Sequence, residues 1–210
     1  MARKVNSSMI MKAMDWAYGK AVTGVPPLPS AQELAEEYLA KDGALREKVD
    51  RLIRWQNTKC ATSGFLTGLG GIITLPVAIP SNISCVIFVQ VRMVAAIAHM
   101  AGHDIRSDPV RTLVYACLTG NAAKDILKDA GIVIGKKLTE QAVKRLSREV
   151  ITKINQRVGF RLLTKFGEKG AINLGRAVPL VGGLIGGTLD AVATNLIGNV
   201  ARDAFVHDRA

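Results

Sequence analysis

Apolar residues recur at intervals of three and four along most of the chain, and this spacing predicts amphipathic helices. The first such segment covers residues 9–20 and stops at TGVPPLPS, where three prolines and a glycine cannot continue a helix. Ser30 and Glu33 have the spacing of a capping box that opens a second helix, and Gly43 stands where the C-terminal glycine of that helix is expected. Apolar positions over 45–56 predict a third helix.

The longest uncharged stretch, residues 61–91, is apolar but is interrupted by glycines and prolines. It is nominally long enough to span a bilayer, which needs about 20 apolar residues. Pro76 and Pro80 divide it, however. We therefore predict a helix, a bend at the prolines and a second helix that runs to Ala101, with Gly102 as its stop.

Helical spacing continues in the second half of the chain. Ser107 followed by Asp108 and a proline predicts a helix start, and the pattern runs on to about Gly131. A longer amphipathic pattern covers 143–166. Since no segment alternates apolar and polar residues over a convincing strand length, we predict an all-α fold, a compact multi-helix domain over residues 1–210.

A stripe of basic residues lies beside the apolar face of the segment 143–166. One basic residue falls on each turn: Lys153, Arg157, Arg161 and Lys165. The net charge of the chain is +11, and residues 136–176 hold eleven basic against three acidic residues. A basic amphipathic helix attracts anionic lipid, so we predict that these four residues contact phosphates. A solvated face that keeps the protein in solution has the same pattern.

Two apolar segments, 63–80 and 173–192, are rich in glycine and contain prolines. Each helical glycine costs about 0.8–1 kcal/mol relative to alanine, so six to eight of them cost roughly 5–8 kcal/mol, which rivals the net stability of a domain. Small residues four apart offset this cost by letting helices approach closely. The glycines expected to do so are Gly64, Gly68, Gly182, Gly183, Gly186 and Gly187. A hairpin that enters a membrane and a tightly packed helical core both fit this pattern.

A few polar residues lie in apolar surroundings. Asp190 is the only charged residue in 177–200, and Gln90, Arg92 and Asn173 are placed similarly. Because a buried charge is costly unless it is paired, we predict that Asp190 pairs with Arg92. Such a pair is either a structural link or a functional polar site between helices.

His99 and His103 have the i, i+4 spacing of two metal ligands. The segment lacks the glutamate of an HExxH motif, and Gly102 is expected to end the helix between the two histidines. We therefore predict two exposed histidines at a helix end, with no metal site and no other cofactor.

Asn121, Lys124, Asp125 and Lys128 share one face of a predicted helix. A carboxylate between lysines could alter a lysine pKa for catalysis, which makes a hydrolase with a site between helices one alternative. An ordinary ladder of salt bridges is the other interpretation. No catalytic residues are assigned, because the chain has no P-loop and no GxSxG motif.

Aromatic residues make up only 5% of the chain. Within the basic segment only Phe160 and Phe166 could stack on bases, and both are expected on the apolar side. Nucleic acid is therefore not an expected partner.

The three cysteines, Cys60, Cys85 and Cys117, never form a CxxC pair, which argues against a disulfide scaffold and indicates a reducing compartment. The basic N-terminus lacks the uninterrupted apolar core of a signal peptide. We expect a cytoplasmic protein, peripheral to the inner face of the membrane or conditionally inserted in it.

Three segments carry a resemblance to a known family: RWQNTKCATSGFLTGLGGIITLPVAIPSNI, GNAAKDILKDAGI and LLTKFGEKGAINLGRAVPLVGGLIGGTLDAV. Together they resemble the EcsC protein family of bacteria, and the similarity runs from about Trp16 to Phe205. The family takes its name from a component encoded beside an ABC-type exporter in Gram-positive bacteria. The resemblance implies a membrane connection rather than a reaction. Some relatives carry hydrolase or peptidase labels, without an agreed catalytic motif.

The combined expectation is a membrane-associated protein that binds an anionic lipid surface or a membrane partner and has no assigned catalytic activity. The alternatives are the hydrolase described above and a soluble adaptor for a transporter or another protein.

Overall fold

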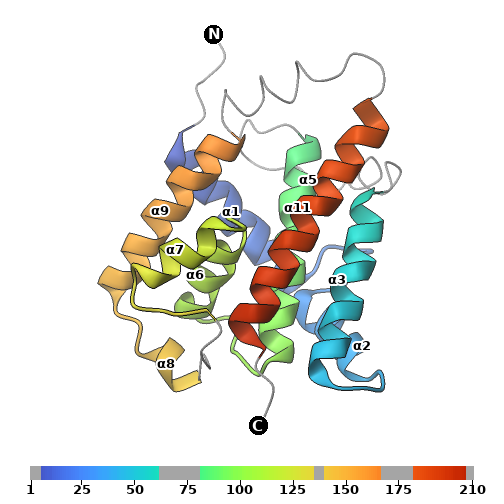
Figure 1. The fold of residues 1–210 in the computed structure, drawn as a ribbon, viewed down its shortest axis with the longest axis horizontal. Helices are drawn as coiled ribbons and strands as arrows, with labels where there is room; N and C mark the ends of the chain where they lie inside the picture. The colour runs from blue at the N-terminus through green and yellow to red at the C-terminus, as the bar shows by residue number, and fades with distance from the viewer. Residues whose placement is uncertain (1–5, 62–80, 135–139, 167–181, 207–210) are drawn as a thin grey trace.

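The computed structural model describes residues 6–61, 81–134, 140–166 and 182–206, with the backbone alone described for some helical residues, among them 165–166 and 182–190 (Figure 1). The helices are α1 (Ser7–Thr23), α2 (Ala31–Leu39), α3 (Leu45–Ala61), α5 (Ser81–Met100), α6 (Asp108–Cys117), α7 (Ala122–Lys128), α8 (Glu140–Lys144), α9 (Arg148–Phe166) and α11 (Gly182–Phe205). Within these ranges no strand forms, apart from one isolated bridge between Val25 and Leu28. The predicted all-α class is confirmed.

Helix α5 occupies the centre of the molecule. Every side chain from Cys85 to Ala98 is buried, and α1, α2, α3, α6 and α11 all pack against the helix (Figure 1). A helix that is apolar on all sides is stable only when other elements surround it completely. The apolar sequence of α5 therefore sets the arrangement of the whole bundle.

The helix boundaries depend on local signals, most of which the sequence analysis found. The capping box is confirmed: the backbone N–H of Glu33 donates to Ser30 Oγ at 3.1 Å, and that of Ser30 donates to Glu33 Oε2 at 2.7 Å. Gly102 follows the end of α5 with φ of +87°, as expected of a stop. The predicted role of Gly43 is wrong, because α2 ends with Ala40 as its cap and Gly43 belongs to the turn that leads into α3.

Two long predicted helices are each divided in the structure. The pattern expected to run to Gly131 breaks between α6 and α7, where Gly120 adopts a φ of +64° that a continuing right-handed helix excludes. The pattern expected over 143–166 breaks between α8 and α9. There Ser147 Oγ accepts a hydrogen bond from the backbone N–H of Val150 at 3.3 Å and so marks a new helix start.

At two helix crossings a glycine allows the helices to approach closely. A Cβ added to Gly159 of α9 would lie 3.2 Å from Met11 Cγ of α1, and one added to Gly198 of α11 would lie 2.8 Å from both Cγ atoms of Ile53 of α3. Real Cβ atoms essentially never approach other atoms as closely as 2.8 Å, so the side chain of Ile53 in α3 lies directly against the backbone of α11 at this point.

The glycines that the sequence analysis selected are not the ones at these crossings. Gly64 and Gly68 lie outside the described residues. Gly182, Gly183, Gly186 and Gly187 belong to α11, but the structure does not describe what surrounds them. Their predicted part in close packing stays a prediction.

Candidate functional site

The orientation of α9 is fixed by its inner face. Ile154, Val158 and Leu162 are buried at spacings of four, and Gly159 brings the same side of the helix close to α1. Helices α1, α6 and α7 all pack against α9. The opposite face of α9 therefore points toward solvent.

The outward face carries the basic residues that the sequence predicts. Lys153, Arg157 and Arg161 are exposed, whereas the side chain of Lys165 lies outside the described structure. Phe160, three residues after Arg157 and directly before Arg161, is 62% exposed. The expectation that Phe160 lies on the apolar side is wrong.

The position of Phe160 has a simple geometric cause. It is two residues from both Val158 and Leu162, which rotates its side chain by about 200° away from the buried stripe. The sequence thus contained the signal, because the buried positions recur every four residues and Phe160 falls between them. Phe166, the other aromatic residue of this segment, has a side chain that the structure does not describe.

One acidic residue contacts this face. Asp129, the C-cap of α7, forms an ion pair with Arg157, and Lys153 Nζ lies 3.5 Å from the backbone oxygen of Asp129. The hydrogen bond and charge of Arg157, helped by the charges of Lys153 and Lys128, hold the pKa of the Asp129 carboxyl below its usual value. Among the described residues Arg161 has no acidic partner. We call this surface the α9 basic face and define it by Lys128, Lys153, Arg157, Phe160 and Arg161.

The predicted buried polar residues fall into two groups. Gln90 and Arg92 lie in the core: Gln90 Nε2 donates to Thr194 Oγ1 of α11 at 3.0 Å, and Arg92 Nη1 donates to the backbone oxygen of Pro29 at 3.1 Å. Arg92 thus joins α5 to the connection between α1 and α2. Asn173 lies outside the described residues, as does the side chain of Asp190, so the predicted pair between Arg92 and Asp190 stays a prediction.

The two histidines do not form the exposed pair that the sequence predicts. His99 is half-buried, whereas His103 is only 4% exposed, and its ring centroid lies 5.3 Å from that of Phe205 in α11. The chain turns back after Gly102, which places His103 against the last turn of α11. The described residues contain no group of three His, Cys, Asp or Glu residues that could hold a metal ion.

A model of the EcsC protein family matches residues 29–207. The chain belongs to the EcsC protein family. No curated protein and no solved structure matches it. The matched range includes α2 to α11, and therefore the α9 basic face, but not α1, which packs against Gly159.

None of the helices that the structure describes in this EcsC protein combines the length and the apolar character needed to cross a membrane. The segment 63–80, which the sequence analysis treated as one arm of a hairpin, lies outside the described residues. Whether the hairpin enters a membrane therefore stays an expectation from the sequence.

The hydrolase alternative relied on Asn121, Lys124 and Asp125. In the EcsC protein all three are exposed, and they lie on or next to α7, which has only seven residues. No described element covers them. An enclosed site between helices would need side chains that converge from several elements, and these three do not provide it.

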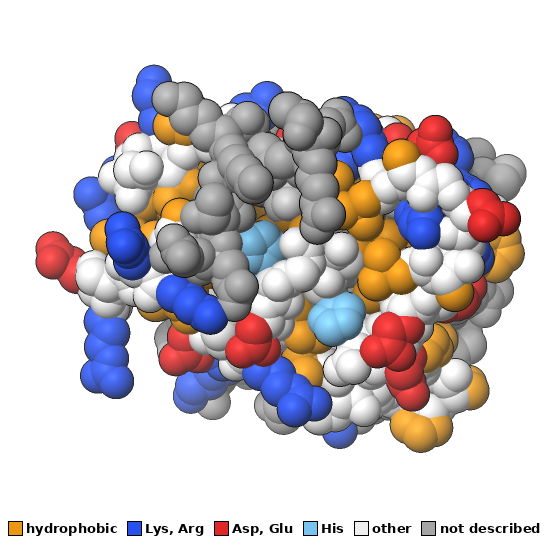
Figure 2. Space-filling model, turned by 90° about the horizontal axis from the view of Figure 1, so that it is seen from below, with side chains coloured by type: hydrophobic (Ala, Val, Ile, Leu, Met, Phe, Trp, Pro, Cys, Tyr) orange, Lys and Arg blue, Asp and Glu red, His pale blue; other side chains and the backbone are white. Residues whose placement is uncertain are grey.

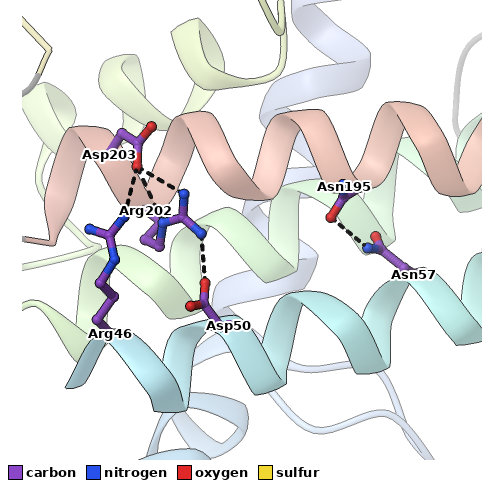
Figure 3. A network of polar contacts seen from close by, with 6 residues as sticks. All are labelled: Arg46, Asp50, Asn57, Asn195, Arg202 and Asp203. Atoms are coloured by element: carbon purple, nitrogen blue, oxygen red, sulfur yellow. Dashed lines mark hydrogen bonds and ion pairs between the residues drawn. The ribbon is translucent and has the colours of Figure 1, made fainter. Parts of the chain in front are cut away.

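A polar network between α3 and α11 was not predicted (Figure 3). Arg202 donates to Asp50 at 2.7 Å and to Asp203 at 3.1 Å, and Arg46 lies 3.8 Å from Asp203. These residues hold the ends of two helices together. Because the two arginines and two aspartates pair with one another, little net charge remains at this position to attract a ligand. The end of the EcsC protein seen in Figure 2 likewise has acidic and basic side chains interspersed among apolar ones. The α9 basic face, in contrast, is mostly of one sign: its four basic side chains have Asp129 beside them and the exposed Glu149 one turn before Lys153.

Proposed function

We propose that this EcsC protein binds the surface of anionic membranes through the α9 basic face. The observation that carries the proposal is the position of Phe160, which is 62% exposed, directly precedes Arg161 and follows Arg157 by three residues, on a helix that is packed tightly on its other side. Exposed aromatic residues flanked by cations are typical of helices that lie in the plane of a membrane interface. Exposure to water is unfavourable for Phe160 unless another phase covers it.

The charge of this face supports the same proposal. Asp129 neutralises Arg157 and leaves Lys128, Lys153 and Arg161 as a cationic excess. Each basic residue near an anionic surface contributes about 1 kcal/mol. A few such residues and one inserted aromatic ring therefore give weak, reversible and salt-sensitive binding.

The proposed mode of binding is peripheral. Residues Ile154, Val158 and Leu162 belong to the protein core, so α9 can lie on a membrane without leaving the bundle. The inner face of the cytoplasmic membrane is the proposed location, because that leaflet carries anionic lipid.

Flotation of the full chain with vesicles tests the proposal. Vesicles of phosphatidylcholine, with and without phosphatidylglycerol, are compared at low and high salt. We expect flotation only with the anionic vesicles at low salt, and its loss in Phe160→Ser and Arg161→Glu. Arg106→Glu changes the same charge at an exposed loop position outside α9 and should float normally. The proposal would be overturned if flotation were the same with neutral and anionic vesicles, or if both α9 variants still floated.

A further inference from the structure

A second candidate binding surface lies between α2 and α3. It is an open hollow of about 490 Å³, lined among others by Glu37, Tyr38, Lys41, Arg51, Arg54 and Trp55. Figure 1 shows α3 and α9 on opposite sides of the bundle, with α11 and α5 between them. The hollow is therefore separate from the α9 basic face.

Two of the residues that line the hollow are aromatic, Tyr38 and Trp55. Tyr38 is buried, and the ammonium group of Lys41 lies 3.6 Å from the centroid of its ring. Trp55, in contrast, is 51% exposed. It stands next to Gln56, which is fully buried, and across the helix from the buried Ile53. Trp55 thus presents a large apolar surface at the edge of a concave site.

The charges around the two aromatic residues are mostly positive. Lys41 is paired with Glu37 at 3.2 Å, and Arg51 donates to the backbone oxygen of Asp42. Arg54 is exposed and has no acidic partner in the described part of the chain. One carboxylate against three cations leaves the hollow with an excess of positive charge.

We propose that the hollow between α2 and α3 docks an acidic segment of a partner protein, with an apolar side chain of that segment against Trp55 and its carboxylates against Arg51 and Arg54. Trp, Tyr and Arg are the residue types that dominate binding energy at protein interfaces, and here they meet in one concavity. The guanidinium groups suit carboxylates, which they bind in a planar, bidentate geometry. The inference does not depend on membrane binding by α9.

A peptide selection tests which kind of protein segment binds in the hollow. A random library of displayed peptides is selected on the immobilised full chain, and the enriched peptides are then synthesised. The chain has two tryptophans, so the variant Trp16→Phe leaves Trp55 as the only tryptophan reporter. We expect peptides rich in Asp and Glu that also carry an apolar residue, and we expect them to shift the emission of Trp55 on binding.

Two variants and a control decide whether the selected peptides use the hollow. Arg54→Glu and Trp55→Ala should each raise the Kd at least tenfold, whereas Arg106→Glu, an equal charge change at another exposed arginine, should change it less than twofold. Circular dichroism should show that all three variants keep the fold, since their side chains are exposed.

Several results would overturn this inference. These are the enrichment of basic or uncharged peptides, a failure of any peptide to bind measurably, and equal binding by Arg54→Glu and the parent chain. Anionic vesicles are the last arm of the test. A shift of Trp55 emission with vesicles alone would show that the hollow meets lipid rather than a protein segment.

Discussion

Arg202 of α11 donates a hydrogen bond to Asp50 of α3 across 2.7 Å, and this ion pair joins residues that are 152 positions apart in the sequence. The two side chains are 17% and 31% exposed, so water screens the pair only in part. Near the middle of the same interface, Asn57 Nδ2 donates to Asn195 Oδ1 at 3.0 Å (Figure 3). Polar contacts thus align α3 and α11 on either side of the crossing at Gly198.

The ion pair should contribute measurably to stability. In a double-mutant cycle of Asp50→Asn and Arg202→Met, we expect a coupling energy of about 0.5–2 kcal/mol, because the pair is partly shielded from solvent. The pair Arg111–Asp108, which is more exposed, is the control and should couple by less than about 0.5 kcal/mol. Urea unfolding measures both cycles. Equal coupling in the two cycles would contradict the role given to Asp50 and Arg202.

The crossing at Gly198 should not tolerate a methyl group. We expect Gly198→Ala to lower the free energy of unfolding by about 1–2 kcal/mol, since overpacking against Ile53 outweighs the gain in helix propensity. Gly19→Ala is the matched control, because a Cβ at this helical position would meet no atom within 4 Å. It should stabilise the protein by about 1 kcal/mol. Similar gains in both variants would mean that α3 and α11 are not in close contact.

The buried hydrogen bond between Gln90 and Thr194 predicts a non-additive pair of substitutions. Gln90→Leu or Thr194→Val alone leaves one polar group buried without its partner, which should cost about 1–3 kcal/mol. The double variant removes both groups and should recover much of that loss. Thermal unfolding measures the three free energies. Strictly additive losses would contradict this account.

The ion pair at the α9 basic face predicts a shifted titration. Arg157 holds the pKa of Asp129 below its usual value, so Arg157→Gln should raise that pKa toward the value of an exposed aspartate, about 3.9. Because the pKa is lower in the folded state, the stabilisation is present above the unfolded pKa and is lost as the pH falls through the folded pKa. The carboxyl signal of Asp129 in an NMR titration gives both values. An unchanged pKa in Arg157→Gln would show that Arg157 is not the cause.

Signals that act within a few residues predicted much of this fold. The capping box of Ser30 and Glu33 marks the start of α2 correctly, and the lack of charge in 81–91 anticipates the burial of α5. The breaks at Gly120 and Ser147 were missed, because apolar spacing continues across both and hides the end of one helix and the start of the next.

The candidate site was predicted only in part. One basic residue per turn gave Lys153, Arg157 and Arg161, since helical spacing alone decides that they share a face. The pairing of Arg157 with Asp129 depends on how α7 packs against α9, and no local pattern contains that information. The same holds for Gly159 and Gly198: a single glycine in a helix does not reveal which neighbour it meets.

The full enclosure of α5 has a consequence for synthesis of the chain. Helices α1, α2 and α3 precede α5, but α6 and α11 follow it, and α11 is among the last residues described. While a ribosome is still making α11, one flank of the most apolar helix remains uncovered. Nascent chains that stall before this point would expose apolar side chains of α5 that the folded bundle buries, and such surfaces are prone to aggregation.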